Sequence, residues 1–66
     1  MNVCVNGKTV TVPENCTVAV LIQQLSLGDG KIAVELNRDI VPRSQYALLQ
    51  LEDGDQLEVV QAIGGG

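Results

Sequence analysis

Three consecutive glycines, Gly64 to Gly66, place a carboxylate at the end of the sequence, and this carboxylate is the best candidate for a reacting group. Because glycine has no Cβ, such a stretch can pass through a narrow channel into an active site on another protein. A carboxylate is a poor electrophile until one of its oxygens becomes a good leaving group, as in an acyl adenylate. We therefore expect Gly66 to be the modified residue, with Gly64 and Gly65 threading into a partner that supplies ATP and Mg²⁺. No cofactor is expected to bind this chain itself.

The other residues that could do chemistry are two cysteines, Cys4 and Cys16, in a chain that has no histidine. A zinc site needs about four Cys or His ligands, and a Cys–His or Ser–His pair needs a histidine. We expect no metal site, no catalytic residue and no enzymatic activity. Both cysteines are expected to be reduced packing residues. A Cys4–Cys16 disulfide is possible on paper, and a Cys16 thiolate would gain some stability from the N-terminus of a following helix.

Two loops resemble ligand sites only in part. The segment from Gly28 to Lys31 has neither the spacing of a phosphate loop nor a Ser or Thr after the lysine, and a strand follows it. The acidic segment from Glu52 to Asp55 has too few oxygen ligands at calcium-loop spacing. It is expected to be a tight turn in which Gly54 adopts positive φ.

Charge and hydropathy narrow the classes of partner. Four basic residues stand against eight acidic ones, for a net charge of −4, so binding to nucleic acid or to an acidic membrane surface is not expected. No apolar run approaches the ~20 residues of a membrane span. The residues after Met1 lack the features of a signal peptide. We expect a cytoplasmic protein that is monomeric when free.

The elements that must position the tail follow from the hydrophobic periodicity. Alternation over residues 1–12 around Asn6-Gly7 predicts a β-hairpin. Thr17 is the expected N-cap of a helix with an apolar stripe at Val18, Leu21, Ile22 and Leu25, ended by Gly28 to Gly30. Further strands are expected over 31–37 and 56–62, with a short extended piece over 40–42 and a loose turn or single helical turn over 44–49.

This order of elements predicts one α+β domain over residues 1–63, followed by a tail over 64–66. The fold class is a ubiquitin-like β-grasp, a mixed sheet of about four to five strands with one main helix packed across it. The tail is expected to be disordered in the free protein. The predicted core consists of the inward-facing residues of these elements: Val3, Val5, Val10, Val12, Leu21, Ile22, Leu25, Val34, Leu36, Leu57 and Val59.

A partner surface is expected beside the tail. By the period of two, Glu58, Val60 and Ala62 lie on the opposite face of the last strand from Leu57 and Val59, and Ile63 comes next. We expect this apolar strip, with an acidic rim of Glu58, Asp55 and Asp53, to bind a partner with an apolar centre and a basic rim.

Several segments together resemble the thiamin-biosynthesis sulfur carrier (ThiS) family over nearly the whole chain. They are Asn6 to Lys8, Leu36 to Arg43, Asp53 to Asp55, and Gly65-Gly66, of which Val41-Pro42-Arg43 is the most specific. Where many members of that family carry a tryptophan or another bulky ring, this chain has Tyr46.

The resemblance implies a mechanism and a set of partners. An ATP-dependent adenylating enzyme related to the ubiquitin-activating enzymes (ThiF-like) converts the Gly66 carboxylate to an acyl adenylate. A persulfide from a cysteine desulfurase or another donor then replaces AMP to give a thiocarboxylate. Thiazole synthase (ThiG-like) takes this sulfur for the thiazole ring of thiamin.

Two other functions stay open at this point. The first keeps the chemistry but delivers sulfur to molybdopterin, to cysteine or to tRNA. The second is a noncatalytic ubiquitin-like interaction module whose tail does not react. A small enzyme is the least favoured interpretation.

Overall fold

A computed structural model describes residues 1–27 and 31–61 of the chain. Five strands, one α-helix and one short 3₁₀ helix lie within these ranges. They are β1 (Asn2–Val5), β2 (Lys8–Thr11), α1 (Val18–Gln24), β3 (Ile32–Leu36), β4 (Asp39–Val41), η1 (Arg43–Gln45) and β5 (Gln56–Gln61). Neither of the described helices is both long and apolar enough to span a bilayer.

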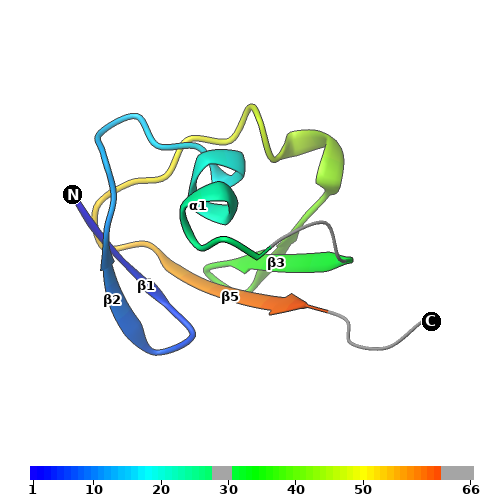
Figure 1. Ribbon diagram of the computed structural model, residues 1–66, viewed down its shortest axis with the longest axis horizontal. Helices are drawn as coiled ribbons and strands as arrows, with labels where there is room; N and C mark the ends of the chain where they lie inside the picture. Colours follow the sequence, from blue (N-terminus) through cyan, green and yellow to red (C-terminus); the bar gives the residue numbers. More distant parts are fainter. Residues whose placement is uncertain (28–30, 62–66) are drawn as a thin grey trace.

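The strands form one mixed sheet in the order β2-β1-β5-β3-β4, and α1 lies across one face of it (Figure 1). Strand β5 runs parallel to β1 and antiparallel to β3, while the two hairpins β1–β2 and β3–β4 are antiparallel. This arrangement confirms the predicted fold class. The last strand in the sequence is therefore the central strand of the sheet, and it joins the two hairpins.

The first hairpin turns at the residues that the sequence predicts. Asn6 and Gly7 have φ values of 51° and 83°, so both central residues of the turn occupy the left-handed region, as a type I′ turn requires. Val5 pairs with Lys8 directly across this turn. Pro13, which cannot donate a ladder hydrogen bond, lies just beyond the end of β2.

Helix α1 begins as predicted but ends earlier. Thr17 is the N-cap, and its hydroxyl accepts a hydrogen bond of 3.2 Å from the backbone N–H of Val20. The last helical residue is Gln24, whereas the sequence predicts an end at residues 28–30, which lie outside the described residues. Ser26 adopts a φ of 56°, so the left-handed conformation expected of a glycine occurs at a serine instead.

The second hairpin has a less familiar turn. Asn37 and Arg38 occupy the left-handed region with φ values of 49° and 74°, and they connect β3 to β4. Helix η1 begins at Arg43, one residue before the predicted segment. The hydroxyl of Tyr46 donates a hydrogen bond of 3.1 Å to the backbone oxygen of Ile32, which ties this segment to β3.

The core lies between α1 and the inner face of the sheet. Most of the predicted core residues are buried there, but Val10, Ile22, Leu25 and Leu36 are only partly buried and pack around its edge. The residues that complete the core lie mainly in short segments without a clear period, where no hydrophobic pattern could indicate their orientation. The full buried set is Val3, Val5, Val12, Cys16, Val18, Leu21, Val34, Val41, Leu51, Leu57 and Val59.

Candidate functional site

Strand β5 carries the chain toward Gly66, so its surroundings determine what a partner meets next to the reacting group. Leu57 and Val59 point into the core and are buried, as predicted. Glu58 and Val60 are exposed on the opposite face, which we call the outer face of the sheet, and the Val60 side chain is 62% exposed. The predicted alternation along this strand is confirmed.

The side chain of Asn6 holds β5 near its C-terminal end. Its Nδ2 donates a hydrogen bond of 3.0 Å to the Val59 oxygen, and its Oδ1 accepts one of 2.9 Å from the Val59 N–H. Strand β1 ends at Val5, so no backbone of β1 faces Val59. The amide of Asn6 therefore continues the parallel ladder by the equivalent of one residue and satisfies both backbone groups of Val59.

Asn37 holds the N-terminal end of β5 by a similar pair of hydrogen bonds. Its backbone N–H donates to the backbone oxygen of Gln56 at 2.7 Å, and its side-chain Oδ1 accepts from the backbone N–H of Gln56 at 3.0 Å. Its Nδ2 also donates to an oxygen of Asp55 at 3.1 Å. The two asparagines in left-handed turns thus bind β5 from neighbouring hairpins, one near each end of the strand.

The acidic side chains of the turn before β5 also accept hydrogen bonds from backbone N–H groups. Gly54 has a φ of 88°, as predicted for this turn. One carboxylate oxygen of Asp55 accepts from the Glu52 N–H at 2.7 Å, and Asp53 accepts from the Asn2 N–H at 2.8 Å. In the described part of the chain, no group of three or more Cys, Asp or Glu side chains is placed to hold a metal ion.

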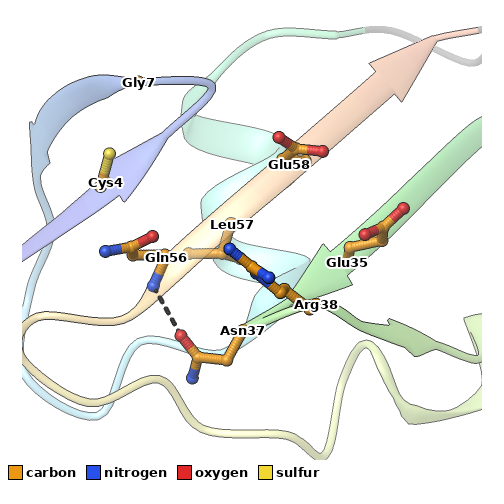
Figure 2. A pocket seen from close by; sticks show the side chains of 8 residues that line it. All are labelled: Cys4, Gly7, Glu35, Asn37, Arg38, Gln56, Leu57 and Glu58. Carbon is orange, nitrogen blue, oxygen red and sulfur yellow. Dashed lines mark hydrogen bonds between the residues drawn. The ribbon is translucent and has the colours of Figure 1, made fainter.

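A shallow hollow of about 450 Å³ opens on the outer face, at its centre. Figure 2 shows that Glu35, Arg38, Gln56 and Glu58 lie around it, together with Cys4. Figure 2 draws the hydrogen bond from the Gln56 N–H to the Asn37 side chain, and it draws none between Arg38 and the carboxylate of Glu35 or Glu58. Charged groups of both signs therefore face solvent on this surface.

The two cysteines differ in environment. Cys4 is a free thiol, partly exposed on the outer face. Cys16 is a free thiol with 1% exposure, and its Sγ–H donates to the Thr17 oxygen at 3.3 Å. Burial raises the pKa of the Cys16 thiol, an effect that opposes any stabilisation of its thiolate by the helix N-terminus.

Only part of the predicted site falls within the described residues. Glu58 and Val60 are on the outer face as expected, whereas Ala62, Ile63 and the glycines Gly64, Gly65 and Gly66 lie outside the described residues. Asp53 and Asp55 accept hydrogen bonds in the turn before the N-terminal end of β5, whereas Val60 lies near the C-terminal end of that strand. They do not rim Val60, and the carboxylate directly opposite Glu58 is that of Glu35.

Glu35, Ile40 and Asn6 also belong to this site, although no sequence pattern indicates it. Glu35 and Ile40 join it because β3 pairs with β5 on one side and with β4 on the other. Asn6 was recognised as a turn residue only. Its Asn-Gly context indicates the turn, but nothing in the sequence indicates that the amide reaches a strand more than fifty positions away.

Comparison with known proteins identifies the family. The model of the ThiS family matches residues 2–66 of this chain. The chain belongs to the ThiS family. Sulfur carrier protein ThiS from Escherichia coli is 35% identical over 66 residues, which is 100% of both chains. The resemblance drawn from the sequence is thereby confirmed.

A solved structure agrees with this family membership. The crystal structure of a thiamine biosynthesis protein (ThiS) from Geobacter metallireducens superposes with a TM-score of 0.83 at 35% identity, and the match covers 100% of both chains. A thiazole synthase from Paramagnetospirillum magneticum is 42% identical to this ThiS-family chain over 66 residues. Those residues are 100% of this chain but only 20% of the synthase, so the chain spans about a fifth of that relative.

Proposed function

We propose that this chain is a sulfur carrier of thiamin biosynthesis that carries sulfur as a thiocarboxylate on Gly66. The observation that carries the proposal is the family match, which runs to residue 66 and so includes the terminal glycines. The ThiS relative from Escherichia coli, matched over its whole length, bears the name sulfur carrier protein. As a carrier, the chain is a co-substrate of enzymes and is not itself a catalyst.

The chemistry requires two successive substitutions, one at the α-phosphorus of ATP and one at the Gly66 carbonyl carbon. In the first, a carboxylate oxygen attacks the α-phosphate of ATP on the adenylating enzyme, which releases pyrophosphate and leaves an acyl adenylate. In the second, the terminal sulfur of a persulfide attacks the carbonyl carbon, and AMP departs with the C–O bonding electrons. A thiol then reduces the resulting acyl persulfide by cleaving its S–S bond, which leaves the thiocarboxylate.

The chain's own residues fix the position of the strand that leads to Gly66. Asn6 and Asn37 hold β5 in register between β1 and β3, so the strand that leads to Gly66 starts from a fixed place. Glycines without a Cβ favour passage of the terminal residues into an enclosed active site. The ATP, Mg²⁺ and catalytic groups belong to the partner enzyme in this proposal.

Thiazole synthase is the proposed acceptor of the sulfur. Two relatives named thiazole synthase contain a segment that aligns with the whole of this chain and makes up 20% of their length. A synthase that holds such a segment in one polypeptide keeps carrier and acceptor at high effective concentration. We further propose that a cysteine desulfurase or another persulfide donor supplies the sulfur, and that the reaction takes place in the cytoplasm, where ATP is available.

Intact-mass spectrometry tests the carrier proposal directly. The purified chain is incubated with ATP, Mg²⁺, the adenylating enzyme and a persulfide donor, and we expect a mass gain that corresponds to replacement of one oxygen by sulfur. A semisynthetic chain that ends in a Gly66 carboxamide is the matched control, because an amide cannot be adenylated. No gain in a mixture that thiolates another ThiS protein would contradict the proposal. Deletion of the gene should cause a thiazole requirement and leave molybdoenzyme activity intact.

A further inference from the structure

Asn6 is followed by Gly7, and this pair of residues is prone to a reaction of the chain with itself. The backbone nitrogen of the second residue can attack the side-chain amide carbon, Cγ, of the asparagine. A side chain on the second residue hinders this approach, and glycine has none. The other three asparagines of the sequence precede Val3, Cys16 and Arg38. Asn6 is therefore the asparagine that the sequence makes most reactive.

The fold binds the amide that this reaction would consume. Oδ1 of Asn6 accepts a hydrogen bond of 2.9 Å from the Val59 N–H, and Nδ2 donates one of 3.0 Å to the Val59 oxygen. Attack at Cγ makes this carbon tetrahedral and turns Nδ2 into the leaving group, so both hydrogen bonds must be given up. They join the turn of the first hairpin to the central strand β5, and they break when the two separate. The fold thus protects the residue that the sequence makes reactive.

We propose that Asn6 is a site of spontaneous deamidation that β5 controls, so that the residue reacts only while the turn of the first hairpin is separated from that strand. The Gly7 nitrogen bonds to Cγ of Asn6, the Cγ–Nδ2 bond breaks, and the amide nitrogen leaves as ammonia with the proton of the Gly7 N–H. The resulting cyclic imide takes up one water at either carbonyl carbon and opens to aspartate or isoaspartate. Neither step needs an enzyme, a cofactor or the sulfur chemistry of Gly66.

Both products prevent the contact with β5 from forming again. Aspartate has no N–H for the Val59 oxygen and places a carboxylate oxygen beside it, in a part-buried position where an unpaired acceptor is unfavourable. Isoaspartate carries the main chain through Cγ, so it adds one atom to a two-residue turn across which Val5 pairs with Lys8. A transient separation is thereby converted into a permanent loosening of the strand that leads to Gly66.

Deamidation rates of the full chain test the site and its protection. Intact mass at mildly alkaline pH follows the replacement of an amide NH₂ by OH, and peptide mapping assigns the gain to each asparagine. Asn37 is the internal control, because its side chain also binds the backbone of β5 but Arg38 follows it. In urea we expect Asn6 to react at least about tenfold faster than Asn37, since only Asn6 precedes a residue without a Cβ. In the folded chain we expect Asn6 to react at least about tenfold more slowly than in urea, because only the open population reacts.

Hydrogen exchange of the Val59 amide measures the same opening, since Asn6 accepts the hydrogen bond from this N–H. The factor by which folding slows deamidation should therefore agree with the exchange protection of Val59 within about threefold. Equal rates of Asn6 in the folded chain and in urea would overturn the proposal, as would equal rates of Asn6 and Asn37 in urea. Protection from deamidation far above that of the Val59 amide would show that β5 is not what restrains Asn6.

Two substitutions test the consequence for the strand. Asn6→Asp reproduces one product, and it should lower the denaturation midpoint and reduce the exchange protection of the Val59 amide at least about tenfold. Asn15→Asp is the matched control, because Asn15 also has positive φ, 63°, but is exposed in the segment between β2 and α1. Its Val59 protection should stay within about twofold of that of the unmodified chain. An Asn6→Asp chain with unchanged midpoint and unchanged Val59 protection would refute the loosening of β5.

Discussion

The two faces of the sheet are built from the same strands but have opposite properties. On the inner face, Leu57 and Val59 are buried against aliphatic side chains of α1 and the other strands. On the outer face, Glu58 and Val60 alternate with them and are exposed. Because neighbouring residues of a strand point to opposite faces, stability and recognition can be assigned to alternate positions. Substitutions one residue apart should therefore have different consequences.

The largest effect is expected from the inner face. Leu21 has no exposed surface, and truncation to alanine should lower the free energy of unfolding by about 2–5 kcal/mol through lost burial and a cavity. Val20 in the same helix is 40% exposed, so Val20→Ala is the matched control and should cost less than about 1 kcal/mol. Urea denaturation followed by circular dichroism measures both. Similar costs for the two variants would contradict the burial assigned to Leu21 against the inner face.

On the outer face the expected effect is on binding. Val60→Asp should keep the fold and weaken binding to the adenylating enzyme by about 2 kcal/mol or more, the size of a central contact. Val59→Asp, one residue away, would bury a carboxylate beside Val34 and should instead unfold the domain. Calorimetric affinity and a denaturation curve distinguish the two outcomes. A folded Val60→Asp chain with normal affinity and normal thiocarboxylate yield would show that Val60 is not a contact.

Asn6 connects the faces, because its side chain stabilises the strand that both share. Asn6→Gly tolerates the positive φ but removes the two hydrogen bonds to Val59, so it should cost about 1–3 kcal/mol. Amide hydrogen exchange of Val59 should accelerate more than that of Val34 in the neighbouring strand. Equal acceleration at both amides would indicate general destabilisation and not the loss of a local contact.

The smallest expected effect is a difference in chemical reactivity between the two thiols. Cys4 on the outer face is partly exposed, and Cys16 is buried with a raised pKa. A raised pKa lowers the thiolate fraction at every pH below it, so Cys16 should react with iodoacetamide much more slowly than Cys4 at pH 8. Peptide mapping after timed labelling measures the two rates. Comparable rates in the native protein would contradict the assigned burial, and addition of urea should equalise them.

Local signals predicted most of the fold and only part of the site. Asn6-Gly7 indicates a type I′ turn because both residues tolerate positive φ, and Thr17 indicates a helix start because its hydroxyl can cap. Arg38 and Ser26 adopt positive φ without such a signal, since the surrounding structure imposes it. The opposition of Glu35 and Glu58 depends on the register between strands that are distant in sequence, which no local pattern encodes.

The central position of β5 has a mechanical consequence. A force applied at its C-terminal end, as by an enzyme that pulls on the residues beyond Gln61, acts along the strand and loads its ladders with β1 and β3 together. The hydrogen bonds of both ladders then share the load in shear, whereas the edge strand β4 has only one ladder to carry such a load. Resistance to such pulling is governed by the rate of unfolding and not by the equilibrium stability. An enzyme can therefore draw strongly on the C-terminal residues while the domain that presents them stays folded.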